Sequence, residues 1–427
     1  MRRWLSVIVI GVAACAGASP TPAGDAPEVR AAPAGRDAER HYAIWLGGAQ
    51  IGTAEELERW TAAGVQLRRT EAMRFLRGDA AVVLSTTIEI TADRRLIPSQ
   101  VRWTETGQAI RRGDAVRDAA GWRVTDELGV HRLAGAAIPA ELAPLIVRRD
   151  GRFAGPVFLP ARGFAAGTGR IEPVAPGRLV ARLTAEAGTA ATAEATIDLG
   201  DDAMPIRIVD GEGVIATRIT AAQAAAPFVP VDLIAATSIP LAGEPPRPGA
   251  DRVLALDGEL ALPALPGQAA RATADGVDLT LSPALRGGPP PGAPGADRTP
   301  DILTLVAHVH RRIAPDLAAR PADQPGAART ATAGDCTTFA LAYAALAGDR
   351  GIPTRIVTGF RVDGDRLIRH RWAISWTGRA WIAIDAAFGA VPAGGDLVGV
   401  AVHDAGDLGL VAGETALARL RAAAWRD

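Results

Sequence analysis

The chain has 427 residues, 48% of them hydrophobic and 22% charged, a balance typical of a globular protein with room for two or three domains. Its 46 basic and 47 acidic residues give a net charge of −1. Arginine pairs such as Arg68–Arg69 are scattered and are predicted to be solvated strand ends or turns. Because phosphate binding needs a basic surplus or a basic stripe, we expect no nucleic acid as a partner.

The first 14 residues are predicted to be a secretory signal peptide. They open with two arginines, continue with an apolar run from Leu5 to Val12 and end in alanines. The apolar run is too short to cross a bilayer stably, which takes about 20 residues.

The end of this segment, Val-Ala-Ala-Cys, resembles the bacterial lipobox. The resemblance implies that Cys15 becomes a lipidated N-terminus. Residues 15–40, which begin with a stretch rich in Pro, Gly and Ala, are predicted to be the flexible tether that such an anchor needs. An ordinary signal peptide with an incidental Cys15 is the alternative. Ala16 is not the Asp that retains lipoproteins at the inner membrane of Gram-negative bacteria. The expected location is therefore the bacterial cell envelope, at the outer membrane or periplasm if the host is Gram-negative.

Residues 41–220 are predicted to form a mostly antiparallel β domain. Short alternating segments recur at regular intervals, and the stretch 80–105 contains two of them around a turn at Asp93–Arg94. No group of His, Cys and carboxylate residues with metal-ligand spacing is evident here. His41 and His131 are isolated, and we expect surface or edge roles for both.

Residues 221–299 are rich in Pro and Gly and are predicted to be an extended linker with short strands. The pattern does not decide to which of the two neighbouring domains these strands belong. A third region, residues 300–427, begins with a predicted helix. His308 and His310 in that helix are two residues apart, so they share no helix face and a metal pair is not expected. The helix is predicted from apolar residues at helical spacing, namely Ile302, Leu305, Val306, Val309 and Ile313.

Cys336 is predicted to lie at or just before the N-terminus of a helix that spans residues 337–348. The free N–H groups and the dipole at that end of a helix stabilise a thiolate. Gly334 lets the backbone turn sharply and leaves the sulfur accessible. A structural cysteine would more naturally lie in mid-helix on the apolar stripe, and Cys336 does not.

Residues 370–389 are predicted to form a β-hairpin that brings His370 and Asp385 to the same face of adjacent strands. A two-residue turn at Thr377–Gly378 would place the two side chains directly opposite each other. A four-residue loop ending at Ala380 would place them diagonally, and the pattern does not choose between the registers. In either register the carboxylate can accept the Nδ1–H of the imidazole and leave Nε2 free for a thiol.

These motifs together resemble the transglutaminase-like superfamily over residues 301–389. They are Gly-Asp-Cys at a helix start, Gly-Ile-Pro-x-Arg before a strand, His-x-Trp, and a strand ending in Asp. The resemblance implies a Cys-His-Asp triad of Cys336, His370 and Asp385. It also implies an α+β, papain/transglutaminase-like domain, in which the helix carrying the cysteine packs on an antiparallel sheet. The sequence departs from the family pattern after the acid, where Ala386–Ala387 replaces Pro-Thr.

The main functional hypothesis is an envelope-anchored cysteine acyl-transfer enzyme, since the order and placement of the three residues suit a thiol that attacks an amide. The backbone N–H of Cys336 is the expected oxyanion donor. Water would resolve the thioester in a protease or amidase, and an amine would resolve it in a crosslinking enzyme. Trp372, Trp376 and Trp381 are expected to form core around the site, where one of them can flank an acyl group.

The expected substrate is a peptide, protein or peptidoglycan-type amide, an inference from location and from the habits of the family. The mechanism requires no metal or other cofactor. The alternative hypothesis is a non-catalytic envelope module, in which the transglutaminase-like fold and the β domain bind a peptide, a polymer or a lipid.

Overall fold

The structure is a computed structural model, and the residues it describes fall into the following ranges: 35–107, 110–127, 129–185, 192–211, 213–246, 252–258, 261–274, 276–285, 287, 295–319, 325–405 and 417–426. The predicted signal peptide, Cys15 and most of the predicted tether lie outside this set. Among the residues within it, no helix is both long and apolar enough to cross a membrane.

The chain divides into two compact units, Met1–Leu233 and Ile234–Asp427. The sequence pattern placed the start of the last domain near residue 300, well beyond this division. The difference arises because the short strands of the predicted linker pair with later strands. Strand β17, for example, pairs with β26, with Leu254 opposite Trp425.

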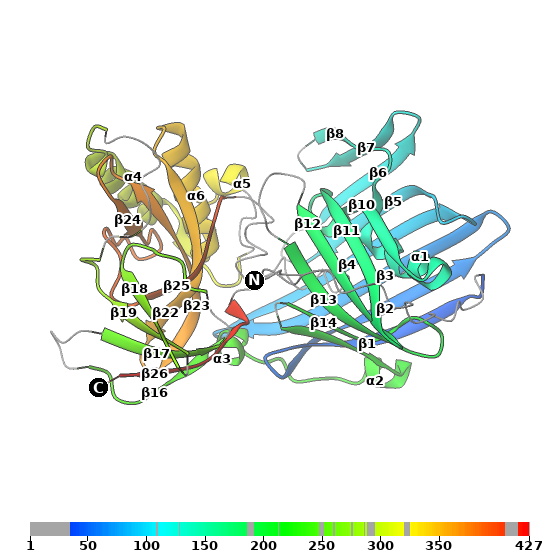
Figure 1. The fold of residues 1–427 in the computed structure, drawn as a ribbon. Coiled ribbons are helices and arrows are strands. Elements are labelled where there is room, and N and C mark those ends of the chain that lie inside the picture. The colour runs from blue at the N-terminus through cyan, green and yellow to red at the C-terminus, as the bar shows by residue number, and fades with distance from the viewer. Residues whose placement is uncertain are drawn as a thin grey trace, which may run out of the picture. The chain divides into compact units, whose positions relative to one another are not determined.

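The first unit contains one antiparallel sheet that runs through 15 strands in the order β8–β1 and then β15–β9, with one parallel pair at the β9–β10 end. Although β5 and β9 are far apart in this order, β5 contacts β9 and the short helix η2, so the sheet is strongly curved (Figure 1). The strands are β1 Ala38–Leu46, β2 Ala49–Trp60, β3 Gly64–Arg77, β4 Ala80–Asp93, β5 Pro98–Thr106, β6 Arg111–Asp118, β7 Gly121–Asp126, β8 Gly129–Leu133, β9 Ile138–Pro139, β10 Phe153–Leu159, β11 Ala165–Ala175, β12 Arg178–Ala185, β13 Thr192–Leu199, β14 Pro205–Asp210 and β15 Val214–Ile219. The helices are η1 Ala140–Leu142, α1 Ala143–Asp150, η2 Pro160–Arg162 and α2 Ala221–Ala225, and a further helix, α3 Leu233–Thr237, begins at the last residue of this unit and continues into the second.

The predicted alternation is confirmed in this unit. Strands β4 and β5 are the two strands predicted on either side of Asp93–Arg94. A core of large side chains fills the concave side of the curved sheet. Trp122 packs edge-on against Phe158 with 5.1 Å between ring centroids, and its Nε1–H donates to the Ala137 carbonyl at 2.7 Å. These contacts join β7 to β10 across the curve of the sheet.

The first unit also buries ionised side chains on the inner face of the sheet. Glu58 on β2 is fully buried and accepts hydrogen bonds from Arg40 (2.6 Å), Trp60 (2.7 Å) and Arg148 (3.0 Å). Burial acts to raise the pKa of Glu58, but the hydrogen bonds from Arg148 and Arg40 outweigh burial, and the pKa lies below its usual range. The carboxylate is therefore a structural anion held by two fixed cations.

Arg69 is buried, contrary to the expectation that this arginine is solvated. It lies within β3 and is 5% exposed, because every second residue of this strand, including Leu67 and Glu71, faces inward. Its Nε donates to Glu71 Oε1 at 2.9 Å. Nearby, Glu141 on η1 is buried, and its Oε2 has no hydrogen-bond partner among the described residues. Burial raises the pKa of Glu141 to about 7.

The second unit contains a sheet in the order β18-β19-β17-β26-β16-β23-β22-β25, with β24 paired to β23, and three further helices among its described residues. Helix α6 contacts β22, β23 and the helices α4 and α5 (Figure 1). The strands are β16 Ile239–Ala242, β17 Arg252–Gly258, β18 Gln268–Thr273, β19 Gly276–Leu281, β20 Ala314–Pro315, β21 Ala333–Gly334, β22 Thr354–Asp363, β23 Arg366–Trp376, β24 Trp381–Ile384, β25 Leu397–His403 and β26 Leu420–Trp425. The helices are α4 Thr299–Arg312, α5 Pro325–Arg329 and α6 Cys336–Asp349.

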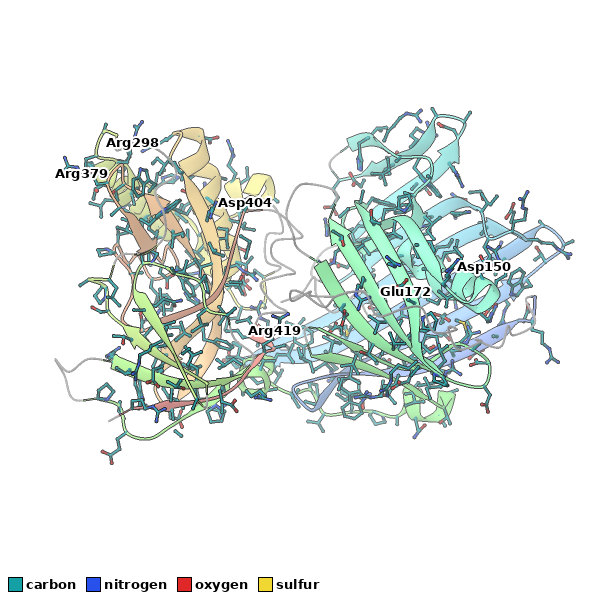
Figure 2. All side chains as sticks on the ribbon, in the orientation of Figure 1. Asp150, Glu172, Arg298, Arg379, Asp404 and Arg419 are labelled. Atoms are coloured by element: carbon teal, nitrogen blue, oxygen red, sulfur yellow. The ribbon has the colours of Figure 1, made fainter. Side chains whose placement is uncertain are left out.

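Helix α4 confirms the helix predicted from residue 300 onward, and four of its predicted apolar positions are buried: Ile302, Leu305, Val306 and Val309. The segment before α4 is fixed to the turn between β23 and β24. The Gly295 N–H donates to the Gly378 carbonyl at 3.0 Å, and the Arg298 N–H donates to the Thr377 carbonyl at 2.8 Å. Arg298 and Arg379 mark this end of the unit in Figure 2.

Candidate active site

Cys336 is the first residue of α6, which confirms its predicted place at a helix N-terminus, and its side chain is partly exposed. Asp335 caps the helix, because its Oδ1 accepts the N–H groups of Thr337 (3.1 Å) and Thr338 (3.4 Å). A Cβ at Gly334 would lie 2.4 Å from Thr338 Oγ1. Glycine is thus required here by the close approach of the first helical turn to the preceding backbone.

Of the two possible hairpin registers, the structure has the one with the four-residue loop. Trp376 lies opposite Trp381, and the pairing ends with Ala373 opposite Ile384. Asp385 therefore lies diagonal to His370, as that register predicts. Thr377 fixes the loop: its Oγ1 accepts the N–H of Ala380 at 3.0 Å and the hydroxyl donates to the Ala380 carbonyl at 3.0 Å.

His370 and Asp385 are joined by a short hydrogen bond in a buried position. The distance from His370 Nε2 to Asp385 Oδ2 is 2.7 Å, and the residues are 8% and 2% exposed. The expectation that Nδ1 would face the carboxylate is wrong. The outer nitrogen of the imidazole, Nε2, reaches the carboxylate instead, and Nδ1 is the nitrogen left for the thiol of Cys336.

The protonation of His370 reflects these neighbours. Burial lowers the pKa of His370, but the charge of Asp385 and its hydrogen bond outweigh burial, and a hydrogen bond and charge interaction with Cys336 act in the same direction. The pKa is raised from its ordinary value of 6.5 to about 10. At neutral pH an imidazolium therefore lies between a carboxylate and a thiol, an arrangement that supports a thiolate nucleophile.

Aromatic rings enclose the imidazole on two sides. Trp372 stacks against His370 with 6.1 Å between centroids and 19° between planes, and Phe388 meets it edge-on at 5.7 Å. Trp372 is buried, whereas Phe388 is 56% exposed. Trp376 and Trp381 pack against each other on the hairpin, with 5.9 Å between their centroids, and belong to or border the core there. Trp372 is the tryptophan that contacts the site.

Arg361 on β22 was not singled out from the sequence, yet it lies beside the acid of the site. Its Nη1 is 3.9 Å from Asp385 Oδ2, and its Nε forms an ion pair with Asp396 Oδ2 at 3.0 Å. Its guanidinium carbon lies 3.5 Å from the centroid of the Phe388 ring. The sequence of an alternating strand does not indicate that one of its arginines lies beside a candidate catalytic group.

The backbone after Asp385 forms a closed turn despite the departure from the Pro-Thr pattern. Asp385 exchanges backbone hydrogen bonds with Ala390 at 3.1 and 3.0 Å, and its Oδ1 accepts the N–H of Ala387 at 3.2 Å. His310 on α4 supports this turn from outside, because its Nδ1 lies 3.2 Å from the Ala386 carbonyl oxygen. His310 thus contacts the backbone of this turn.

Arg371, which follows His370, ties the helix to the sheet. Its Nη1 donates to Thr337 Oγ1 at 2.8 Å and its Nε to Thr358 Oγ1 at 3.1 Å, and it is 3% exposed. Further along the helix, the hydroxyls of Tyr343 and Ser375 are 2.9 Å apart. The alternation of the strand is the sequence signal that could have indicated this placement, since a residue adjacent to His370 faces the opposite side of the strand.

Three residues of the first unit form the one group among the described residues whose donor atoms could hold a metal. His41 lies opposite Glu55 in the pairing of β1 with β2, and its Nε2 is 2.9 Å from Glu39 Oε1. This grouping corrects the expectation that His41 is isolated. Arg68 approaches Glu55 Oε2 at 3.5 Å, so the group already contains its own ion pairs, and we assign no metal to it.

Comparison with known proteins gave one family match, over residues 296–386, to the transglutaminase-like superfamily. No curated protein matched the chain. Among solved structures, a β-barrel-like protein of the DUF1849 family from Brucella abortus is 10% identical, with 43% of this chain and 95% of that chain covered and a TM-score of 0.35. A DUF1089 family protein from Pseudomonas aeruginosa is 11% identical, with 36% and 87% covered and a TM-score of 0.26. A "putative cysteine protease" from Cytophaga hutchinsonii is 16% identical, with 40% and 77% covered and a TM-score of 0.23.

The three TM-scores are below 0.5, so the assignment rests on the family model. The matched range contains Cys336, His370 and Asp385, the residues that the resemblance implied. Members of the superfamily are commonly cysteine-dependent acyl-transfer enzymes or proteases. The chain thus carries a transglutaminase-like domain, matched over residues 296–386, together with a large antiparallel β domain.

Proposed function

We propose that the second unit is a cysteine acyl-transfer enzyme with a papain-like arrangement, in which Cys336 is the nucleophile, His370 the acid and base, and Asp385 the orienting group. One observation carries this proposal. The imidazole of His370 is held by Asp385 through Nε2 at 2.7 Å and interacts with the thiol at the first residue of α6. Nucleophile, base and orienting acid are thereby connected in the order that thiol catalysis needs.

In the first chemical step the Cys336 thiolate attacks the carbonyl carbon of an amide. A sulfur–carbon bond forms and the π electrons of the carbonyl move to oxygen, for which the backbone N–H of Cys336 is the proposed donor. When the carbonyl re-forms, the carbon–nitrogen bond breaks. His370 gives the Nδ1 proton to the leaving amine, and a thioester on Cys336 remains.

In the second step neutral His370 takes a proton from water, whose oxygen attacks the thioester carbonyl. The carbon–sulfur bond then breaks and releases a carboxylic acid and the thiolate. An amine in place of water would give a new amide. The chain contains no lysine, so it offers no lysine ε-amine for such a transfer onto itself. Hydrolysis, as in a protease or amidase, is the outcome that we propose.

The proposed setting is the bacterial envelope. The lipobox-like end of the signal peptide supports lipid anchoring through Cys15, at the outer membrane or periplasm if the host is Gram-negative. In this setting the proposed substrates are peptide, protein or peptidoglycan-type amides. The mechanism has no step that needs a metal or a cofactor.

The rate of thiol alkylation tests the proposal without a known substrate. In the Cys15→Ala protein Cys336 is the only cysteine. We would measure its alkylation by iodoacetamide from pH 4 to 10, with and without His370→Ala. Fast alkylation at pH 6 that is lost in His370→Ala supports an activated thiol. Alkylation that is slow at pH 6 in both proteins would contradict the enzyme and favour a binding module for peptide, polymer or lipid.

A further inference from the structure

Arg361 places a fixed cation beside the acid of the site. Its Nη1 is 3.9 Å from Asp385 Oδ2, the same oxygen that accepts the hydrogen bond from His370. Nη1 is buried and has no hydrogen-bond partner among the described residues. The separation is too long for a hydrogen bond but short enough for a strong charge interaction in a buried position.

Two contacts fix the guanidinium in this place. Its Nε forms an ion pair with Asp396 Oδ2 at 3.0 Å, and the Phe388 ring covers its flat face with the guanidinium carbon 3.5 Å from the ring centroid. The same ring meets His370 edge-on at 5.7 Å. Arg361 is therefore held by Asp396 and by a ring that also borders the imidazole, and its charge cannot move far from Asp385.

The charge of Asp385 has different partners at different stages of the proposed reaction. While His370 is an imidazolium, the carboxylate has a cation at 2.7 Å. Once His370 has given its proton to the leaving amine, that cation is gone, and a residue that is 2% exposed retains a negative charge. An unpaired buried carboxylate is costly. Among the described residues, the cation that remains within 4 Å is Arg361.

We propose that Arg361 is a positioning residue of this site, which stabilises the buried Asp385 carboxylate and so lets His370 release its proton. The inference rests on the proposed function, because it assigns a role within that reaction. The groups that act on His370 are Cys336 on α6, Asp385 after β24 and, through Asp385, Arg361 on β22. Asp396 acts through Arg361. Removal of the Arg361 charge should therefore leave His370 more strongly protonated.

The titration of His370 measures this effect directly. We would follow the imidazole signals by NMR in the full chain, with Cys336→Ser as a common background that removes the influence of the thiol. The loss of a signal in His370→Gln assigns His370 among the six histidines. Arg361→Gln should raise the titration midpoint by about one pH unit, because a cation near the carboxylate is lost. Arg361→Lys should restore the midpoint, since it keeps the charge.

Arg421→Gln is the matched control, because it removes an arginine of the same unit that pairs with Asp257 on an exposed surface. Its midpoint should equal that of the background protein. An unchanged or lowered midpoint in Arg361→Gln would overturn the inference, even where iodoacetamide shows an activated Cys336. A thiol without activation in the protein with Cys336 would overturn the proposed function itself, and the role of Arg361 would fall with it.

Discussion

Both units of the protein bury charged side chains, but they hold them in different ways. In the first unit the fully buried Glu58 faces Arg40 and Arg148, two cations that do not release a proton in the physiological range. In the second unit the buried Asp385 faces His370, whose proton is exchangeable, and Cys336 beyond it is partly exposed.

This difference separates a structural cluster from a candidate catalytic one. Buried ion pairs are common in proteins and by themselves point to no chemistry. The second unit adds a group that can transfer a proton, a nucleophile at a helix N-terminus and access from solvent. The predictions that follow test whether the buried charges of the two units act as this comparison requires.

The largest effect is expected from Glu58→Gln in the first unit. The substitution keeps the shape of the side chain but leaves Arg40 and Arg148 buried without their shared anion. Removal of one partner of a buried ion pair costs about 3–5 kcal/mol of unfolding free energy. Hydrogen exchange read by mass spectrometry would measure this loss separately in each unit.

Asp118→Asn is the control for this change, because Asp118 pairs with Arg132 on an exposed surface at 3.0 Å. It should cost much less than Glu58→Gln. The alkylation rate of Cys336 should stay unchanged in both variants. A large loss of alkylation in Glu58→Gln would show that the buried cluster of the first unit contributes to the chemistry.

A pH-dependent stability is expected next, from Glu141. Burial raises its pKa from 4.5 to about 7, so the folded state binds the proton more tightly than the unfolded chain. The stability that this proton contributes is full below pH 4.5 and is lost as the pH rises through about 7. The difference of about 2.5 pH units corresponds to about 3 kcal/mol.

Urea unfolding of the first unit at pH 4.5 and pH 8 would measure this change. Glu141→Gln has no proton to lose and should remove this part of the pH dependence. In the second unit, His370 should give a pH dependence of stability with the same sign but at a higher pH, because its stabilising proton is lost between pH 6.5 and about 10. Equal pH profiles in the wild type and Glu141→Gln would exclude Glu141 as the cause.

The third effect is a slower alkylation of Cys336, expected in His370→Ala. An ordinary thiol with a pKa of about 8.5 is only about 0.3% thiolate at pH 6. Loss of the imidazolium should therefore slow alkylation at pH 6 by about 100-fold, which corresponds to about 2.7 kcal/mol. His308→Ala changes an exposed histidine of α4 and should leave the rate unchanged. A similar loss in both variants would point to a general change of the fold.

Local patterns predicted which segments form strands and helices better than they predicted which strands pair with each other. The alternation over residues 80–105 and the apolar spacing from Ile302 to Val309 are both confirmed. The pairing of β17 with β26 was not predictable, because Leu254 and Trp425 are far apart in the chain and no local signal joins them. The expectation of a solvated Arg69 fails because the alternation of β3 turns this side chain to the buried side.

The candidate site shows the same limit at the scale of side chains. Motif order predicted Cys336, His370 and Asp385, since each lies where a helix start or a strand end places it. The nitrogen that meets the acid and the contribution of Arg361 were not predictable. Both depend on distances of a few ångströms, which follow from the register of the hairpin and from the pairing of β22 with β23.

The smallest effect is expected from Thr377→Ala, which tests what sets that register. The hydroxyl makes the loop hydrogen bonds to Ala380, and their loss should lower the unfolding free energy of the second unit by about 1–2 kcal/mol. Thr377→Ser keeps the hydroxyl and should restore stability, as measured by urea unfolding. If Thr377→Ala loses no stability and the His370 NMR signal is unchanged, the facing pair Trp376–Trp381 fixes the register instead. The diagonal placement of His370 and Asp385 would then follow from strand packing, and the loop would only accommodate it.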